Sequence, residues 1–245
     1  MLEPVHRQSV SDAVFRQLRD QIVSGAMEPG DALPAERALC EVLGVNRGAV
    51  REALRRLEQA RLVSVRHGGT SLVLDFRQAA GLDLLADLVL RPTGDLDVPV
   101  IRSIIEMRSA IGPDAARLAA MRGGGPTAAR LDAVVAEMIA ADGDLAALQS
   151  LSLDFWSSVI DGCDNLAYRL AYNTLQRVYE RASELVRPLL AEELTALADY
   201  RALAAAVRQG EGTNAEQIAR RLVGRGEEAI RSALDQLAGR SGVRS

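Results

Sequence analysis

The 245-residue chain contains no lysine, so all 29 of its basic side chains are arginines. Histidine is also scarce, because His6 and His67 are the only two and both lie in the first third of the chain. The remaining two thirds therefore offer no imidazole as a general base or as a metal ligand. The sequence also lacks a nucleophile motif and a cluster of metal-ligating residues. We therefore expect neither enzymatic activity nor a bound metal or other cofactor.

Cysteines and long apolar runs are equally scarce. Cys40 and Cys163 lie far apart, each within an apolar helical pattern, which is typical of two buried free thiols rather than of a disulfide. No apolar run approaches the length needed to cross a bilayer. The first twelve residues, MLEPVHRQSVSD, lack the apolar core of a secretion signal. We expect a cytoplasmic protein that does not enter a membrane.

The charge is acidic overall but unevenly distributed. The net charge is -4, and residues 1–80 carry 11 arginines against 10 acidic residues, whereas the rest carries 18 against 23. An acidic protein does not coat nucleic acid nonspecifically, because that requires a broadly basic surface. Any DNA-binding surface must therefore be a local patch.

A short helix is predicted to begin at about Pro34. Proline has a preset φ and no backbone N–H to lose, so it suits the first helical position, with Glu36 favourably placed in the positive first turn. Gly44 can adopt the left-handed conformation that ends a helix. The apolar side of this helix comprises Leu39, Val42 and Leu43.

A second helix is predicted to follow at once, with Asn46 as its N-cap. Arg47, Arg51 and Arg55 recur at i, i+4 and i+8, and Gly48 adds almost no bulk beside them. Such a stripe alone is more typical of a solvated face, but after a tight helix-turn it can reach base edges or phosphates in a major groove. The buried side of the helix is expected to comprise Val50, Ala53, Leu54 and Leu57.

Two short β-rich runs, residues 62–66 and 71–74, flank a glycine-containing turn. This pattern predicts a hairpin whose tip presents His67 and the bare backbone of Gly68 to a groove. A lone histidine in such a turn is more often an ordinary surface residue, but here it occupies the tip of a wing. Together with an upstream helix that would end near Gly25, residues 1–76 are predicted to form a winged helix-turn-helix domain.

These motifs resemble the N-terminal domain of the GntR family of bacterial transcription regulators, whose signature approximates L-P-x-E-R-x-L, then L-G-V-x-R, then V-R-E-A-L-x-x-L. The resemblance implies that Arg37, Arg47, Arg51 and His67 contact double-stranded DNA. It also implies a homodimer that reads the half-sites of a palindromic operator. The full set of DNA contacts that we expect comprises Arg37, Asn46, Arg47, Gly48, Arg51, His67 and Gly68.

After residue 76 the strand patterns end, and helical periods predict an all-helical bundle over residues 77–245. This domain is expected to bind an effector and to dimerise, which makes the whole protein mostly α. The breaks between its helices fall at glycine- and proline-containing segments. The predicted helices cover residues 77–90, 98–121, 126–141, 144–162, 165–187, 191–209 and 214–238.

Two types of helical effector domain accompany such an N-terminal domain. In one, a metal is bound by an Asp and a His at i, i+4 and by two later histidines, but the corresponding positions here hold Ser152, Trp156, Tyr200 and Arg221. A histidine metal site is therefore excluded. The segment DNLAYRLAYNTLQRVYERA is similar to the other type, the FadR-like domain. That resemblance implies a repressor of fatty acid metabolism genes that loses DNA affinity when long-chain fatty acyl-CoA binds.

The resemblance assigns ligand contacts to Arg108, Tyr179 and Arg220. Tyrosines at i, i+4 and i+11 are more typical of a helix core than of a binding site. A buried arginine needs an acidic partner, and Glu106, Asp154 or Glu216 would supply one without any ligand. Two alternatives remain open, namely a regulator that responds to a small carboxylic acid and a DNA-binding protein without an effector. The full set of candidate ligand contacts comprises Arg108, Tyr168, Tyr172, Tyr179, Arg220 and Gly226.

Overall fold

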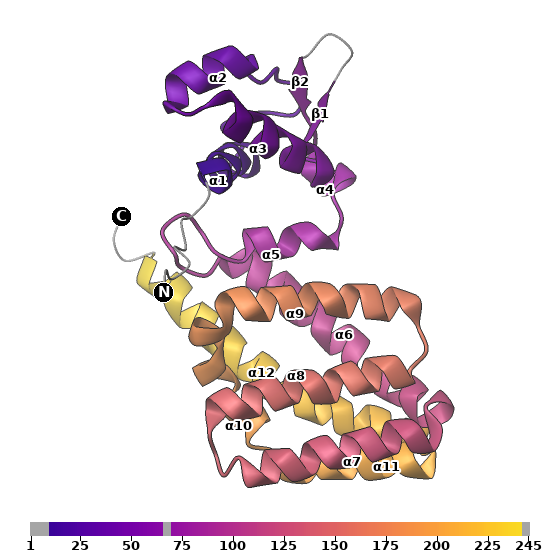
Figure 1. Ribbon diagram of the computed structural model, residues 1–245. Helices are drawn as coiled ribbons and strands as arrows, with labels where there is room; N and C mark the ends of the chain where they lie inside the picture. Colours follow the sequence, from indigo (N-terminus) through magenta and orange to yellow (C-terminus); the bar gives the residue numbers. More distant parts are fainter. Residues whose placement is uncertain (1–9, 66–69, 242–245) are drawn as a thin grey trace, which may run out of the picture. The chain divides into compact units, whose positions relative to one another are not determined.

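The computed structural model describes residues 10–65 and 70–241, which form two compact units that divide between Leu84 and Leu85 (Figure 1). The boundary expected from the sequence lies earlier, after residue 76. The predicted fold class is confirmed, because a small helical unit with one β-hairpin precedes an all-helical bundle. Within the described residues, no helix is both long and apolar enough to span a membrane.

The first unit holds the predicted pair of helices joined by a tight turn. Gly44 has a φ of 64° and ends α2 in the left-handed conformation, as its sequence position predicts. The Asn46 side chain accepts a hydrogen bond of 2.9 Å from the backbone N–H of Ala49, which confirms it as the N-cap of α3. The elements of this unit are α1 (Val10–Val23), α2 (Glu36–Leu43), α3 (Arg47–Gln59), β1 (Val63–Val65), β2 (Ser71–Val73), α4 (Phe76–Ala79) and the 3-10 helix η1 (Leu82–Leu84).

The start of α2 differs from the prediction. The helix begins at Glu36, because Ala35 is extended (φ -56°, ψ 150°) and its carbonyl accepts the hydrogen bond from the N–H of Leu39. Pro34 therefore lies before the helix rather than at its first position. The reason is that residues 30–33 pair with the hairpin, through bonds such as the one from the Leu33 N–H to the Ser71 carbonyl (2.8 Å).

The hairpin itself is as predicted. β1 and β2 are antiparallel, with Val63 opposite Val73 and Val65 opposite Ser71. An additional bridge between Ala32 and Leu72 was not anticipated from the sequence. The predicted contacts at the tip, His67 and Gly68, lie outside the described residues.

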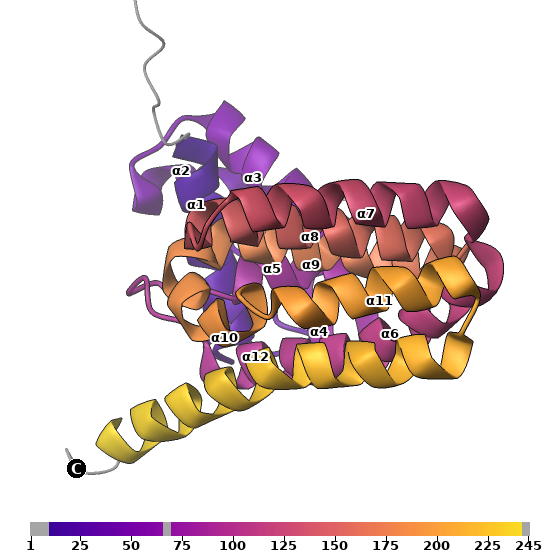
Figure 2. The ribbon, with the colours of Figure 1, turned by 90° about the horizontal axis from the view of Figure 1, so that it is seen from below.

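The second unit is a bundle in which α8 packs against α6, α7, α9 and α10. Figure 2 shows α12 running alongside α6 and α11. The centre is apolar and includes the fully buried rings of Phe155 and Tyr200, which meet edge to face at 4.9 Å. The elements are α5 (Leu85–Leu88), α6 (Val98–Arg122), α7 (Gly124–Ala140), α8 (Leu145–Gly162), α9 (Leu166–Val186), η2 (Arg187–Leu190), α10 (Ala191–Leu194), α11 (Leu197–Gln209) and α12 (Gly212–Ser241).

Two predicted helices are interrupted. The helix expected over residues 77–90 is three short pieces, because Ala80 is extended and is followed by Gly81, which has low helix propensity. The helix expected over residues 191–209 breaks after Leu194. There the Thr195 hydroxyl bonds to the carbonyl of Ala191 (2.8 Å), a local hydrogen bond that competes with helix continuation.

The two cysteines are free thiols, as expected, but only one of them is fully buried. Cys163 caps the C-terminal end of α8 in the core, whereas Cys40 on α2 is half-buried. The expectation of two buried thiols is therefore wrong for Cys40. It lies on the short helix α2, whose main packing partner among the described elements is α3.

Truncation of Leu57 tests the core of the first unit. Because Leu57 is fully buried on α3, Leu57→Ala should destabilise this unit by about 2–5 kcal/mol. Denaturation followed by circular dichroism should show an early transition. The fluorescence of Trp156, the single tryptophan, should keep its midpoint because it reports on the second unit. Val42→Ala, at an 82% exposed side chain, is the control and should shift stability by no more than about 0.5 kcal/mol.

Candidate functional site

The exposed side of α3 carries two arginines that one carboxylate holds in place. The side chains of Arg47 and Arg51 are 76% and 70% exposed. Glu36, at the start of α2, accepts a hydrogen bond from Arg47 Nε at 3.0 Å and lies 3.7 Å from Arg51 Nε. Glu36 therefore aligns both guanidiniums, a role that its sequence position at a helix N-terminus did not reveal.

A surface groove of about 560 Å³ runs beside this arginine pair and is lined in part by Gly48, Arg51, Arg55 and Ser71. Gly48 has no side chain that would fill the groove, and a Cβ at this position would come within 3.2 Å of the Asn46 oxygen that caps α3. The expected DNA contacts Asn46, Gly48 and Arg51 are therefore neighbours in the structure. Arg55 is 58% exposed and pairs with Glu52 at 2.8 Å.

The other arginines of the first unit differ in the exposure and in the contacts of their side chains. Arg37 is 92% exposed and pairs with Glu41, one turn along α2 at 2.9 Å. Arg56, in contrast, forms an ion pair with Asp12 and lies over the ring of Phe15 at 4.3 Å, so it joins α3 to α1. Exposed ion pairs contribute only about 0–1 kcal/mol, so the guanidiniums of Arg37, Arg47 and Arg51 can exchange carboxylates for phosphates or bases at little cost.

The second unit contains an enclosed cavity of about 40 Å³, lined by residues of α6, α8, α9, η2, α10 and α12. Most of its lining is apolar, including Leu175, Leu194 and Val223. Of the candidate ligand contacts, Arg108, Tyr172 and Tyr179 line it. A second cavity of about 30 Å³, with otherwise aliphatic walls, adjoins Arg108 and Tyr179 as well.

Arg108 forms a buried ion pair with Glu193 on α10, and the two side chains are 11% and 1% exposed. Burial alone would lower the pKa of Arg108, but the charge of Glu193, its hydrogen bond to Arg108 and the nearby tyrosines together outweigh burial and raise that pKa above its usual value. Burial raises the pKa of Glu193, because the charge of Arg108 only partly offsets the loss of solvent. The partners proposed from the sequence are wrong for Arg108, since Glu106 and Asp154 are exposed.

The tyrosines of α9 have different roles. Tyr172 donates a 2.6 Å hydrogen bond to the carbonyl of Leu153, so its hydroxyl is already used. Burial raises the pKa of both Tyr172 and Tyr179, which keeps their hydroxyls neutral at the cavity wall. Tyr168 lies outside the cavity lining and donates a 2.9 Å hydrogen bond to Asp114 on α6.

Two further candidate ligand contacts lie outside the cavity lining. Arg220 is 65% exposed on α12 and pairs with Glu216 at 2.9 Å, one of the partners proposed from the sequence. Gly226 is buried against the ion pair, and a Cβ at this position would collide with Glu193 Oε2 and come within 3.3 Å of Arg108. Gly226 therefore leaves room for Glu193, a role that only a residue without a side chain can fill.

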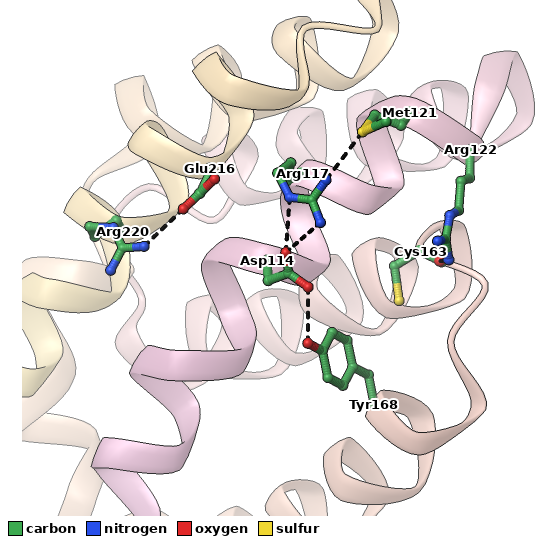
Figure 3. A network of polar contacts seen from close by, with 8 residues as sticks. All are labelled: Asp114, Arg117, Met121, Arg122, Cys163, Tyr168, Glu216 and Arg220. Carbon is green, nitrogen blue, oxygen red and sulfur yellow. Dashed lines mark hydrogen bonds and ion pairs between the residues drawn. The ribbon is translucent and has the colours of Figure 1, made fainter.

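The surroundings of Tyr168 form a polar network that joins α6 to α9 (Figure 3). Asp114 lies between Arg117 and Tyr168, and it accepts bonds of 2.7 Å and 2.9 Å from them. Burial alone would raise the pKa of Asp114, but these two hydrogen bonds outweigh it and lower that pKa. Arg122 donates to the carbonyl of Cys163 at 3.0 Å. This network is a structural clamp on the outside of the bundle.

The positions that correspond to the metal-binding type hold no metal-ligating set. Ser152 and Tyr200 are buried and joined by a hydrogen bond of 2.8 Å, so two hydroxyls satisfy each other there. Arg221 is exposed and pairs with Asp199 at 2.8 Å. Over residues 10–65 and 70–241, no group of three or more His, Cys, Asp or Glu side chains is arranged to hold a metal.

Three residues of the cavity escaped the sequence analysis as ligand contacts. Gln149, Trp156 and Glu193 each line the cavity and are 6%, 6% and 1% exposed. Glu193 lies 85 residues from Arg108, so no local pattern links them. Trp156 also packs edge to face on Phe155 in the core, with 6.2 Å between ring centroids.

Comparison with known proteins identifies both units. The family model described as bacterial regulatory proteins, gntR family, matches residues 10–73, and the FCD domain model matches residues 103–225. The chain is 40% identical to the HTH-type transcriptional regulator Mce2R of Mycobacterium tuberculosis, over 98% of this chain and 99% of that protein.

Two other relatives are less similar. The galactonate operon transcriptional repressor of Escherichia coli is 31% identical, over 85% of this chain and 91% of that protein. The fatty acid metabolism regulator protein of Edwardsiella ictaluri is 29% identical, over 72% of each chain.

The clamp in Figure 3 is tested by removing one hydroxyl. Tyr168→Phe should raise the pKa of Asp114 toward its ordinary value of about 3.9, because a hydrogen bond to the carboxylate is lost. Because folding lowers the pKa of Asp114, the ionised carboxylate stabilises the folded protein at pH values above the unfolded pKa. That stabilisation is lost as the pH falls through the folded pKa. Acid unfolding of the variant should therefore begin at a higher pH.

The Asp114 carboxyl is followed by ¹³C NMR titration, and unfolding is followed by circular dichroism. Tyr172→Phe is the control, because the Tyr172 hydroxyl bonds a backbone carbonyl and not Asp114. An unchanged Asp114 titration in Tyr168→Phe would contradict the assigned hydrogen bond.

Proposed function

Because this chain belongs to the gntR family of bacterial regulatory proteins and carries an FCD domain, it is a DNA-binding transcription regulator rather than an enzyme, and we propose that an organic acid ligand in the second unit controls its operator binding. The observation that carries the proposal is an enclosed, largely apolar cavity with a buried arginine, Arg108, in its wall. A buried guanidinium matches an acid or phosphate group.

The DNA-binding half of the proposal uses the exposed face of α3. Arg47 and Arg51 would read base edges or nearby phosphates, with Arg37 at the backbone and His67 at the wing tip. Two copies of the chain would bind the two half-sites of a palindromic operator as a homodimer. The alignment of Arg47 and Arg51 by Glu36 supports this arrangement, because it fixes both side chains before DNA arrives.

The first candidate ligand is a long-chain fatty acyl-CoA, with the protein as a repressor of fatty acid metabolism genes. Arg108 and Tyr179 support it, because both line the first cavity and also a second, aliphatic one, so polar and apolar parts of an amphipathic molecule would meet matching walls. The similarity to a fatty acid metabolism regulator protein also supports an acyl-CoA ligand. The exposed position of Arg220 removes one of the three expected contacts from the cavity.

The second candidate is a small carboxylic acid, and one specific observation favours it. The first cavity measures about 40 Å³, which holds roughly two or three waters and not a long acyl chain unless the helices move. A relative described as a galactonate operon repressor is also consistent with a small acid.

Fluorescence anisotropy on DNA from the upstream region of the chain's own gene separates these candidates. Long-chain acyl-CoA, free CoA and small carboxylates are titrated into the protein–DNA complex. Release by acyl-CoA but not by CoA would establish the first candidate, and release by a small carboxylate alone the second. If no compound changes the anisotropy, the protein is a DNA-binding protein without an acid effector and the proposal fails.

Arg51→Ala tests the DNA face. The variant should lose about 1–3 kcal/mol of binding to the specific operator and much less on random DNA, because a base contact carries sequence information that a phosphate contact does not. Both affinities are measured at one salt concentration, since the phosphate contribution depends on salt. Arg130→Ala, at an exposed position on α7, is the matched control. Equal losses on specific and random DNA would contradict a base-reading role for Arg51.

A further inference from the structure

Two buried N–H groups of cavity residues, Gln149 Nε2 and Trp156 Nε1, have no hydrogen-bond partner in the part of the chain that the structure describes. A third buried atom without a hydrogen bond of normal geometry, Glu193 Oε2, lies against Gly226 of α12, whose backbone N–H lowers the pKa of Glu193. The orientation of the Gln149 amide is fixed, because its Oε1 accepts a 2.8 Å bond from Arg187 Nε. Buried polar groups without partners cost free energy, so these atoms indicate a molecule that is bound there.

The unpartnered atoms define the chemistry of that molecule. Two are N–H donors, from an amide and an indole, and the guanidinium of Arg108 lies in the same wall. The hydroxyls of Ser152 and Tyr172 are already used within the protein. The excess of donors matches a ligand with two acceptor oxygens, such as a carboxylate.

Charge balance sets a second condition on such a ligand. Arg108 and Glu193 already neutralise each other, so a carboxylate would add an uncompensated negative charge to a buried site. One proton on Glu193 removes that excess charge.

We infer that this cavity binds the carboxylate of a small monocarboxylic acid through the N–H groups of Trp156 and Gln149, and that Glu193 takes up one proton from solvent as the acid binds. The inference deepens the second candidate ligand and rests on the proposed function to that extent. Arg108 then pairs with the ligand carboxylate, and the protonated Glu193 carries no charge.

The surroundings of Glu193 favour this protonation. The titratable groups that face it are Arg108 from α6, Tyr179 from α9 and Tyr200 from α11. α8 presents the neutral Gln149 and Ser152 to the same cavity, η2 presents Leu190, and α12 presents Val223 there and Gly226 against Glu193. Burial raises the pKa of Glu193 even with Arg108 beside it. When a ligand carboxylate draws the charge of Arg108 away, the main influence that opposes protonation weakens.

The single tryptophan allows a direct test in the full-length protein. In ¹⁵N-labelled protein the indole N–H gives one signal, which is followed during titration with butyrate at pH 6, 7 and 8. We expect a downfield shift of this signal and a Kd that rises about tenfold per pH unit, because one proton is taken up per ligand. Butyramide, which has the same shape and no charge, should bind with no dependence on pH.

An unchanged indole signal at saturating butyrate would overturn the inference, because the unpartnered atoms would then be satisfied by water alone. A Kd for butyrate that is independent of pH would overturn the role of Glu193. Both measurements use the wild-type chain, so neither depends on whether a variant folds.

Glu193→Gln places an uncharged N–H donor where the protonated acid would be. Its Kd for butyrate should be independent of pH and at pH 8 at least tenfold lower than that of the wild type. Glu216→Gln removes the same charge from the surface of α12 and should retain the wild-type pH dependence. Gln149→Leu should weaken butyrate binding at least fivefold at every pH. A Glu193→Gln variant that retains the wild-type pH dependence would assign the proton elsewhere and contradict the inference.

The butyrate titration is made without DNA, so its result does not depend on operator binding. If butyrate binds as expected but does not release the operator in the anisotropy experiment, the cavity chemistry stands and the proposed control of DNA binding fails. If acyl-CoA releases the operator while butyrate leaves the indole unchanged, the proposed function stands and the present inference fails.

Discussion

The buried ion pair between Arg108 and Glu193 is the constraint on which the effector unit depends. It joins α6 to α10 across 85 residues of sequence, and its geometry explains why Gly226 of α12 has no side chain. A buried pair of this kind is not a strong source of stability, because desolvation of both charges offsets their attraction. We propose that its value lies in a change of partners, because a ligand that competes for either charge would weaken the link between α6 and α10.

The ion pairs of Glu36 in the DNA-binding unit lie at the surface, in contrast to this buried pair. The arginines that we propose as DNA contacts are exposed, and Glu36 orients two of them through weak surface contacts. Such pairs cost little to break, so the same side chains can be positioned in free protein and released to DNA. Control of the operator then requires that the ligand bind more tightly to one of two arrangements of the protein than to the other. The proposed re-pairing of Arg108 with the ligand would provide a difference of that kind within the effector unit.

The winged unit could be predicted from sequence because its determinants are local. Gly44 ends one helix, Asn46 caps the next within two residues, and the hairpin follows from short β-rich runs. The cavity could not be predicted in the same way, since Glu193 and Gln149 meet Arg108 only through the packing of the bundle. Resemblance alone led to Arg220, which lies on the surface. Residues 77–90 and 191–209 were expected to be continuous helices because apolar periodicity does not register an extended alanine or a competing threonine hydroxyl.

The central claim is that one acid in the cavity and the operator are thermodynamically coupled. The most direct test is the affinity of the acid that releases the operator, measured on free protein and on the protein–operator complex. Coupling is reciprocal, so the operator should weaken binding of the acid by the same factor by which the acid weakens binding of the operator. Equal factors are the predicted result. An acid affinity that is identical with and without operator, while the acid still releases DNA, would contradict the claim.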